Sequence, residues 1–237
     1  MPASSSSDPT DALLAAQRTY YDLRAPDYMN PRAPTDRRSR GQLSSGVVRR
    51  TVANFAPRGD VLELACGSGA FTQVLTDHAT TLTCVDGSPQ MLTLNREVVG
   101  DPDITYIEAD LFSWSPPRRF DHVFFGFWLS HVPPSRFDDF WDLVDRCLLP
   151  GGRACFVDED ERGITNEANH RPGDVPTAQR KLRDGRRFTI VKVFWNPAEL
   201  ETRLAGIGWT AAVRPLGETC IAGSAYRYDD AASRYAL

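Results

Sequence analysis

Three acidic residues and two glycines stand at spacings that suit binding of a nucleotide-like ligand. Residues 61–72 read VLELACGSGAFT, an apolar run that contains Glu63 and leads into a turn with Gly67 and Gly69. Glycines at a turn between a strand and a helix let a ligand contact the backbone, because no Cβ intervenes. We therefore expect this turn to form a nucleotide-binding loop.

The other two acids end the next apolar runs. Asp86 follows the run 81–85 and lies 17 residues beyond Gly69, and Asp110 ends the run 104–109. A carboxylate at the end of the second strand can accept hydrogen bonds from both hydroxyls of a ribose. Asp110 has an alternative role as the cap of the turn that follows it.

A dinucleotide site is disfavoured. An NAD-dependent oxidoreductase would carry G-x-G-x-x-G, and the third glycine counted from Gly67 falls on Thr72. A catalytic Tyr/Lys or histidine dyad is also missing from the expected positions.

The motifs resemble those of the class I S-adenosylmethionine-dependent methyltransferases of the small-molecule type. ELACGSGA at 63–70 is similar to motif I, E/D-x-G-x-G-x-G, with Ala65 replacing the first glycine, and CVDGSPQML at 84–92 resembles V-D-x-S-x-x-M-L. The methyl of Ala65 is expected to be tolerated if its φ is negative. The stretch 148–160, LLPGGRACFVDED, resembles the helix, PGG turn and strand found widely in that family.

The resemblance implies S-adenosyl-L-methionine as the cofactor. Glu63 and the loop would hold its methionine end, Asp86 its ribose, and Met91 and Asp110 its adenine, with the Leu111 amide on a ring nitrogen. The full set of implied cofactor-binding residues is Tyr20, Tyr28, Glu63, Ala65, Gly67, Gly69, Asp86, Gly87, Met91, Asp110, Leu111 and Phe127.

A tyrosine-rich segment precedes motif I. YYDLRAPDYMN at 20–30 resembles the segment that folds over cofactor and substrate in many small-molecule methyltransferases. A tyrosine there can bring its hydroxyl to the methionine carboxylate and its ring to the sulfonium, and we assign Tyr21 to the substrate. Packing of the three tyrosines onto the core is the alternative.

A long apolar run, FDHVFFGFWLSHV at 120–132, suits a strand buried on both faces of a parallel sheet. It resembles motif IV, F-D-x-V…L-x-H-V, which implies that Phe127 and Trp128 border the sulfonium and the substrate. His131 then lies just beyond the strand as the candidate catalytic base or substrate hydrogen-bond partner. Its alternative role is to orient the loop before Pro133.

Asp158, Glu159 and Asp160 follow the next predicted strand, 153–157. They suit an amine, a base role or a solvated strand end, and we assign Glu159 to the substrate. No metal site is expected, because histidines do not stand at metal-ligand spacing from these acids, although neighbouring carboxylates can hold magnesium weakly.

The expected fold is α/β: a Rossmann-like, seven-stranded, mostly parallel sheet with helices on both faces and an antiparallel terminal strand. Residues 1–10 are Ser/Pro-rich and expected to be disordered. A helical cap is expected at 11–57, with a helix capped by Asp11, the methyltransferase domain at 58–228 with a polar, arginine-rich lid at about 160–187, and a tail at 229–237. Further elements are expected at 46–55, 71–78, 136–149 after Ser135, 188–195, 198–206, 209–216 and 220–226.

Composition limits the partners. The formal net charge of −4 provides no excess positive field for nucleic acid, and neither a run of about 18 apolar residues nor a signal peptide is present. We expect a cytoplasmic monomer or homodimer that binds neither membrane nor nucleic acid. The five dispersed cysteines are expected to be buried thiols.

The expected function is methyl transfer from S-adenosylmethionine to an O, N or C nucleophile of a small molecule, in bacterial specialised metabolism. The apolar run 120–132 lacks the N/D-P-P-Y/F of enzymes that methylate amino groups of nucleic-acid bases. A cofactor-binding protein without transfer activity and an NAD-dependent oxidoreductase are the alternatives.

Overall fold

The computed structural model describes residues 8–28, 43–167 and 169–227, without the side chain of Tyr28. Its core is a seven-stranded sheet in the order β3-β2-β1-β4-β5-β10-β9. The strands are β1 (Asp60–Leu64), β2 (Thr81–Asp86), β3 (Thr105–Glu108), β4 (Phe120–Gly126), β5 (Leu148–Glu159), β9 (Trp209–Leu216) and β10 (Cys220–Arg227). β1 to β5 run parallel and β10 is antiparallel to both neighbours, which confirms the expected Rossmann-like sheet.

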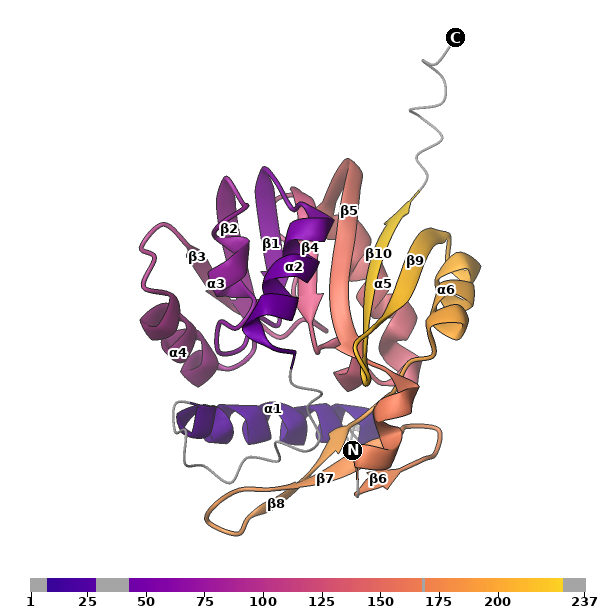
Figure 1. Cartoon of the computed structure of the whole chain (residues 1–237). Helices are drawn as coiled ribbons and strands as arrows, with labels where there is room; N and C mark the ends of the chain where they lie inside the picture. The colour runs from indigo at the N-terminus through magenta and orange to yellow at the C-terminus, as the bar shows by residue number, and fades with distance from the viewer. Residues whose placement is uncertain (1–7, 29–42, 168, 228–237) are drawn as a thin grey trace, which may run out of the picture.

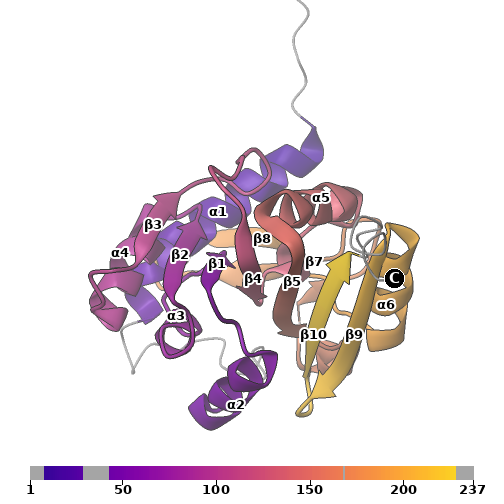
Figure 2. The ribbon, with the colours of Figure 1, turned by 90° about the horizontal axis from the view of Figure 1, so that it is seen from above.

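Helices cover both faces of this sheet. They are α2 (Ser45–Phe55), α3 (Thr72–Leu75), α4 (Pro89–Val99), α5 (Phe137–Cys147) and α6 (Pro197–Gly206). Figure 2 shows α5 on one face, and α2 with α3 on the other. The apolar residues of α5 pack against Phe125 and Phe156 of the sheet, and this aromatic cluster includes Trp141. Because β1 and β4 lie in the middle of the sheet, their apolar runs are buried on both faces.

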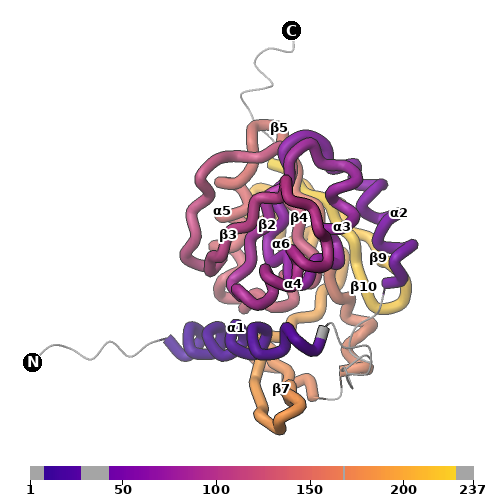
Figure 3. The backbone as a smooth tube through the Cα atoms, turned by 90° about the vertical axis from the view of Figure 1, so that its left-hand side faces the viewer, coloured from indigo at the N-terminus to yellow at the C-terminus, as the bar shows by residue number. Residues whose placement is uncertain are grey.

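One long helix and a small second sheet lie beyond the carboxyl ends of the parallel strands. Helix α1 (Pro9–Tyr28) crosses these ends, and the lid sheet lies on its far side (Figures 1 and 3). This sheet is antiparallel and consists of β6 (His170–Arg171), β7 (Thr177–Lys181) and β8 (Arg187–Val191). The described residues also form three 3₁₀ helices: η1 (Leu129–His131), η2 (Pro134–Arg136) and η3 (Glu161–Asn166).

The lid leaves and rejoins the large sheet through one narrow neck. Asp160 and Trp195 form a parallel bridge. The Trp195 amide donates to the Glu159 carbonyl at 3.1 Å, and the Glu161 amide donates to the Trp195 carbonyl at 3.2 Å. Residues 161–194 therefore form an insertion whose two ends are joined by hydrogen bonds.

Several predicted boundaries were wrong. The strand predicted to run through residue 132 ends at Gly126, because Phe127 has a φ of 55° and the chain then enters η1. Residues 188–195 do not join the large sheet; the first of them belong to β8 of the lid, which is longer than expected. Helix α5 begins at Phe137 after η2, so Ser135 does not cap it.

Smaller differences occur near the N-terminus and in α3. Helix α1 begins before Asp11, and Asp8 accepts a hydrogen bond from the Thr10 amide at its start. Of the predicted cap at 11–57, whose described residues are 11–28 and 43–57, α1 lies over the strand ends and α2 packs against α3. The helix expected at 71–78 is a single turn. Of the disordered tail predicted at 1–10, residues 1–7 lie outside the described residues, and the prediction was wrong for Pro9 and Thr10, which belong to α1. The tail predicted at 229–237 also lies outside the described residues.

Two further observations concern the whole fold. All five cysteines are buried and free, as expected. Within the described ranges, no helix has the length and apolar character needed to cross a membrane.

Candidate cofactor and acceptor site

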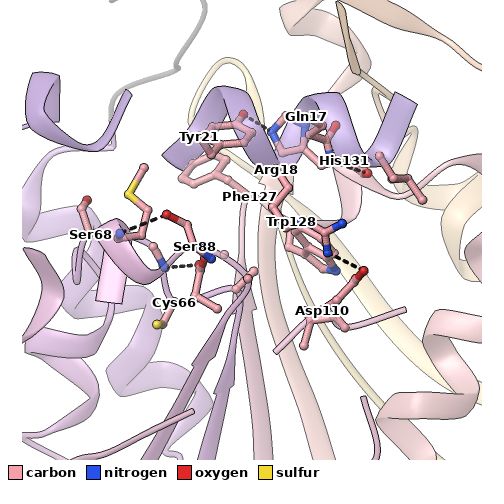
Figure 4. A pocket seen from close by; sticks show the side chains of 18 of the residues that line it. Gln17, Arg18, Tyr21, Cys66, Ser68, Ser88, Asp110, Phe127, Trp128 and His131 are labelled. Atoms are coloured by element: carbon pink, nitrogen blue, oxygen red, sulfur yellow. Dashed lines mark hydrogen bonds and ion pairs between the residues drawn. The ribbon is translucent and has the colours of Figure 1, made fainter. Parts of the chain in front are cut away.

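A pocket of about 210 Å³ lies between the carboxyl ends of the parallel strands and the underside of α1 (Figure 4). It has two ends. The cofactor end is bordered by Ala65, Cys66, Gly67, Ser68, Asp86, Gly87, Ser88, Met91, Asp110, Leu111 and Phe127. The acceptor end is bordered by Gln17, Tyr21, Trp128, His131, Glu159, Arg180 and Lys192. Most of the residues predicted for the two ligands therefore meet in one cavity.

The loop after β1 contains three left-handed residues: Ala65 and Gly67 each have a φ of 52°, and Gly69 has a φ of 89°. The condition under which the Ala65 methyl was expected to be tolerated, a negative φ, is not met, so this residue is held in a strained backbone conformation. A Cβ placed on Gly67 would meet no atom within 4 Å, because the position faces the cavity. A Cβ on Gly69 would lie 3.0 Å from Asn95 Oδ1 and 3.1 Å from Val99, so Gly69 serves the packing of α4 and does not line the pocket.

Asp86 ends β2 and holds the loop in place. Its Oδ2 accepts from the Gly67 amide and its Oδ1 from the Ser88 amide, both at 2.8 Å. Burial raises its pKa to about 6, against the opposing effect of these amides.

Asp110 lies at the adjacent strand end and is tied to α1. Its Oδ2 accepts from the Arg18 guanidinium at 2.5 Å, and its Oδ1 accepts from the Phe112 amide at 3.1 Å. The turn-capping role and a position in the pocket thus coexist in one side chain. Arg18 was not predicted, because an arginine on a polar helix face resembles any solvated side chain.

Glu63 does not line the pocket. Its buried carboxyl accepts from the Thr72 hydroxyl at 2.6 Å and from the Cys84 thiol at 3.5 Å, beneath the loop. Burial raises its pKa to about 8. The arrangement indicates support of the loop from below, in place of direct contact with the methionine end of a cofactor.

His131 and Tyr21 form a hydrogen-bonded pair at the acceptor end (Figure 4). His131 Nδ1 lies 2.8 Å from the Val191 carbonyl, which can only accept, so Nδ1 carries the proton in the neutral ring. Nε2 then accepts from the Tyr21 hydroxyl at 2.8 Å. Gln17 spans the same elements: its Nε2 donates to the His131 carbonyl at 3.2 Å, and its Oε1 accepts from the Val191 amide at 2.9 Å.

Tyr20 does not line the pocket. Tyr20 is buried against Tyr21 and Phe188 of the lid, which is the packing role considered as its alternative. The side chain of Tyr28 lies outside the described residues.

Two buried cations at the acceptor end, Arg180 and Lys192, were not predicted from the sequence. Lys192 pairs with Glu159, and Arg180 donates to both carboxylate oxygens of Glu167 at 2.8 and 2.6 Å. A lysine inside the apolar run FTIVKVFW is a signal that could have marked Lys192 as functional; Arg180 lies in an arginine-rich segment and has no such signal.

The acids that flank Glu159 face elsewhere. Asp158 accepts from the amides of Ser130 and Glu159, and burial raises its pKa to about 6. Asp160 pairs with Arg162 at 2.7 Å. All three acids are buried, so the solvated strand end considered for them was wrong. Among the described residues, no group of three or more His, Cys, Asp or Glu side chains could hold a metal ion.

Known proteins share this architecture. The family model of a methyltransferase domain matches residues 61–152. A solved structure of DhpI in complex with SAH is 34% identical, covers 92% of this chain and 98% of its own, and has a TM-score of 0.77. A DhpI complex with SAM and HEP is 36% identical over 90% of this chain and 97% of its own, with the same TM-score of 0.77.

This chain belongs to the class I S-adenosylmethionine-dependent methyltransferases. Its cofactor is S-adenosyl-L-methionine, as the sequence motifs predicted. Curated relatives of the methyltransferase include trans-aconitate 2-methyltransferase of Escherichia coli (strain 55989 / EAEC), 33% identical over 75 residues, and nodulation protein S of Rhizobium tropici, 29% identical over 128 residues. The matches span 31% and 52% of this chain, and 29% and 50% of the lengths of those two relatives.

Proposed function

We propose that this methyltransferase transfers a methyl group to a small molecule that carries an anionic group. The observation that supports it is the division of one pocket into a cofactor end with two carboxylates and an acceptor end with buried cations beside the Tyr21–His131 pair. The name of the relative that acts on trans-aconitate, an acid, agrees with such an acceptor.

The residues at the cofactor end fit S-adenosylmethionine chemically. The open space above Gly67 leaves room for a ligand against bare backbone. Asp86 would accept from the ribose hydroxyls, Asp110 from the adenine amino group, and Met91 would pack against the adenine ring. When bound, S-adenosylmethionine supplies a methyl group already activated by its sulfonium.

The acceptor end fits an anion because its two cations, Arg180 and Lys192, have more N–H donors than their protein partners use. Arg180 has five N–H donors, and three of its hydrogen bonds go to Glu167 and the Gln179 carbonyl. Lys192 has three donors and pairs with Glu159. Both cations are almost fully buried, where an ionic interaction with a ligand is screened little by water.

Tyr21 and His131 supply the proton chemistry. If the nucleophile still carries its proton, the Tyr21 hydroxyl is placed to accept it while passing its own proton to His131 Nε2. Holding the acceptor opposite the sulfonium lowers the activation free energy more than the proton transfer does, by several kcal/mol. Phe127 and Trp128 line the pocket and would exclude water from the reacting atoms.

Methyl-labelled S-adenosylmethionine tests the acceptor class. The purified protein is incubated with small carboxylic and phosphonic acids, matched neutral alcohols and matched amines, and with a bacterial extract. We expect label in an acidic small molecule. Label only in neutral or basic compounds would reject the anionic acceptor, and absence of any transfer would indicate a cofactor-binding protein.

Two substitutions separate the ends of the pocket. His131→Ala is expected to lower kcat by about 10²-fold while the calorimetric Kd for S-adenosylhomocysteine stays within twofold. Equal loss of turnover and affinity would refute the proton-accepting role.

Asp86→Ala is expected to raise the Kd for S-adenosylhomocysteine at least about a hundredfold, because two hydrogen bonds to a charged acceptor are lost. Unchanged affinity would reject the assignment of Asp86 to the ribose.

A further inference from the structure

A buried polar network lies directly beneath the cofactor loop, and Asn95 of α4 is its centre. Its Nδ2 donates to the Gly67 carbonyl at 3.1 Å and to the Thr72 hydroxyl at 2.9 Å, and it lies 3.5 Å from the Cys66 carbonyl. Its Oδ1 accepts from the Tyr106 hydroxyl at 3.0 Å. The Asn95 side chain has no exposed surface, so it holds these groups without competition from water.

Two carbonyls of the loop determine where the next two amides point: the Gly67 carbonyl, held by Asn95, and the Cys66 carbonyl, which accepts from Asn95 and also from the Gly69 amide at 3.3 Å. In a planar trans peptide the carbonyl and the following N–H point in opposite directions. With the Cys66 carbonyl turned down to Asn95, the Gly67 N–H points away from it, to Asp86 Oδ2 at 2.8 Å. With the Gly67 carbonyl also turned down, the Ser68 N–H points to the side of the loop that borders the pocket.

We propose that Asn95 is a positioning residue for the cofactor: it fixes the two peptide planes of the loop so that one amide orders Asp86 and the next donates to an anionic group of the bound cofactor. Gly67 and Gly69 permit several peptide orientations in the loop, and the Asn95 amide selects one of them. The Cys66 and Gly67 carbonyls can only accept, so they fix Nδ2 as the end of the Asn95 amide that faces the loop. The Tyr106 hydroxyl then donates to Oδ1 and holds the amide in that orientation.

The position of Asn95 also explains why residue 69 is a glycine. Gly69 does not line the pocket, so contact with a ligand does not require a glycine there. A Cβ there would approach Asn95 Oδ1 to 3.0 Å and its Cγ to 3.1 Å, so the second glycine of the motif makes room for the amide that sets the loop. The inference concerns the cofactor end alone and does not depend on the anionic acceptor proposed above.

Binding of S-adenosylhomocysteine to Asn95→Leu, Tyr106→Phe and Gln73→Leu tests the proposal. Gln73 is the matched control, because its side-chain amide donates to the Val98 carbonyl of α4 at 3.1 Å. Its backbone amide, which donates to the Gly69 carbonyl at 3.1 Å, is retained in Gln73→Leu. At temperatures well below each melting point, we expect Kd to rise at least about tenfold in Asn95→Leu, about threefold in Tyr106→Phe, and not at all in Gln73→Leu.

Two further readouts separate positioning from general stability. At saturating S-adenosylmethionine the KM for the acceptor should stay unchanged in both network variants, and exchange of the Gly67 amide proton should accelerate. A Kd within twofold of wild type in folded Asn95→Leu would overturn the proposal. If that variant does not fold, unchanged Kd and unchanged Gly67 exchange in Tyr106→Phe would overturn it. A wild-type protein that fails to bind S-adenosylhomocysteine would instead contradict the cofactor assignment itself.

Discussion

Ala65 shows how a single residue in the cofactor loop departs from what its motif favours. The family pattern places a glycine there, and the loop keeps the backbone conformation that glycine suits, with a φ of 52°. An L-residue with a Cβ in this region costs roughly 1–2 kcal/mol. The chain therefore carries local strain at the floor of its pocket, which the surrounding loop contacts hold in place.

We predict that Ala65→Gly increases the free energy of unfolding by about 0.5–1 kcal/mol, since relief of strain exceeds the entropy that glycine adds to the unfolded chain. Urea unfolding measures it. Ala56→Gly, at the left-handed C-cap of α2 with a φ of 48°, should act in the same direction, whereas Ala53→Gly inside α2 should lower stability by about 1 kcal/mol. A loss of stability in Ala65→Gly would show that its Cβ contacts outweigh the strain.

For single residues, the sequence predicted which positions border the pocket better than it predicted which atoms their side chains contact. Asp86, Met91, Asp110 and Phe127 border the pocket, as the resemblance to the methyltransferase motifs implied. Glu63 was placed correctly in its strand, but its side chain turns beneath the loop, and no spacing rule specifies which face of a turn a strand residue supports.

Helix α1 is the element that joins the two ends of the pocket. Within two turns it presents Gln17 and Tyr21 to the acceptor end, Arg18 to Asp110, and Asp22 to Ser88, whose hydroxyl donates to Asp22 at 2.7 Å. Docking of this one helix therefore assembles contacts to residues more than a hundred positions away.

Gln17→Leu is predicted to lower kcat/KM for the acceptor by about tenfold or more, because the backbones of His131 and Val191 lose their shared anchor and the imidazole shifts. The Kd for S-adenosylhomocysteine should change less than about threefold. Steady-state kinetics and calorimetry measure the two effects, and exposed Thr19→Val on the same helix serves as the control. Equal loss at both ends would mean that Gln17 holds α1 as a whole.

The lid shows where element prediction from sequence fails. The β-branched run at 188–195 indicated a strand, and β8 is one, but it pairs with β7 instead of the large sheet. Strand propensity does not specify a partner. The pairing depends on contacts distant in sequence, including Gln17 on the Val191 amide and Lys192 on Glu159.

Over the whole molecule, buried carboxyls link stability to pH. Burial raises the pKa of Glu63 to about 8, and that of Asp86 and Asp158 to about 6. A carboxyl with a raised pKa binds its proton more tightly in the folded state, so stability falls as pH rises from the unfolded pKa to the folded one. His122, whose pKa is lowered by burial, has the opposite effect up to about its unfolded pKa of 6.5.

We predict that the ligand-free protein loses on the order of 1 kcal/mol of stability between about pH 6.5 and 7.5, a window in which Glu63 dominates. Glu63→Gln removes this slope, since an amide keeps the Thr72 contact without titrating. Denaturant unfolding at several pH values measures both proteins. The same slope in wild type and Glu63→Gln would show that another group titrates in this window.

The neck at Asp160 and Trp195 has a consequence for how such enzymes diversify. Everything between those two residues enters and leaves the fold at a single point, while the strand ends that bear Asp86 and Asp110 belong to a separate part of the chain. An ancestor could exchange this whole segment by recombination and acquire a new acceptor preference while keeping its methyl donor, provided that the replacement still docks on α1.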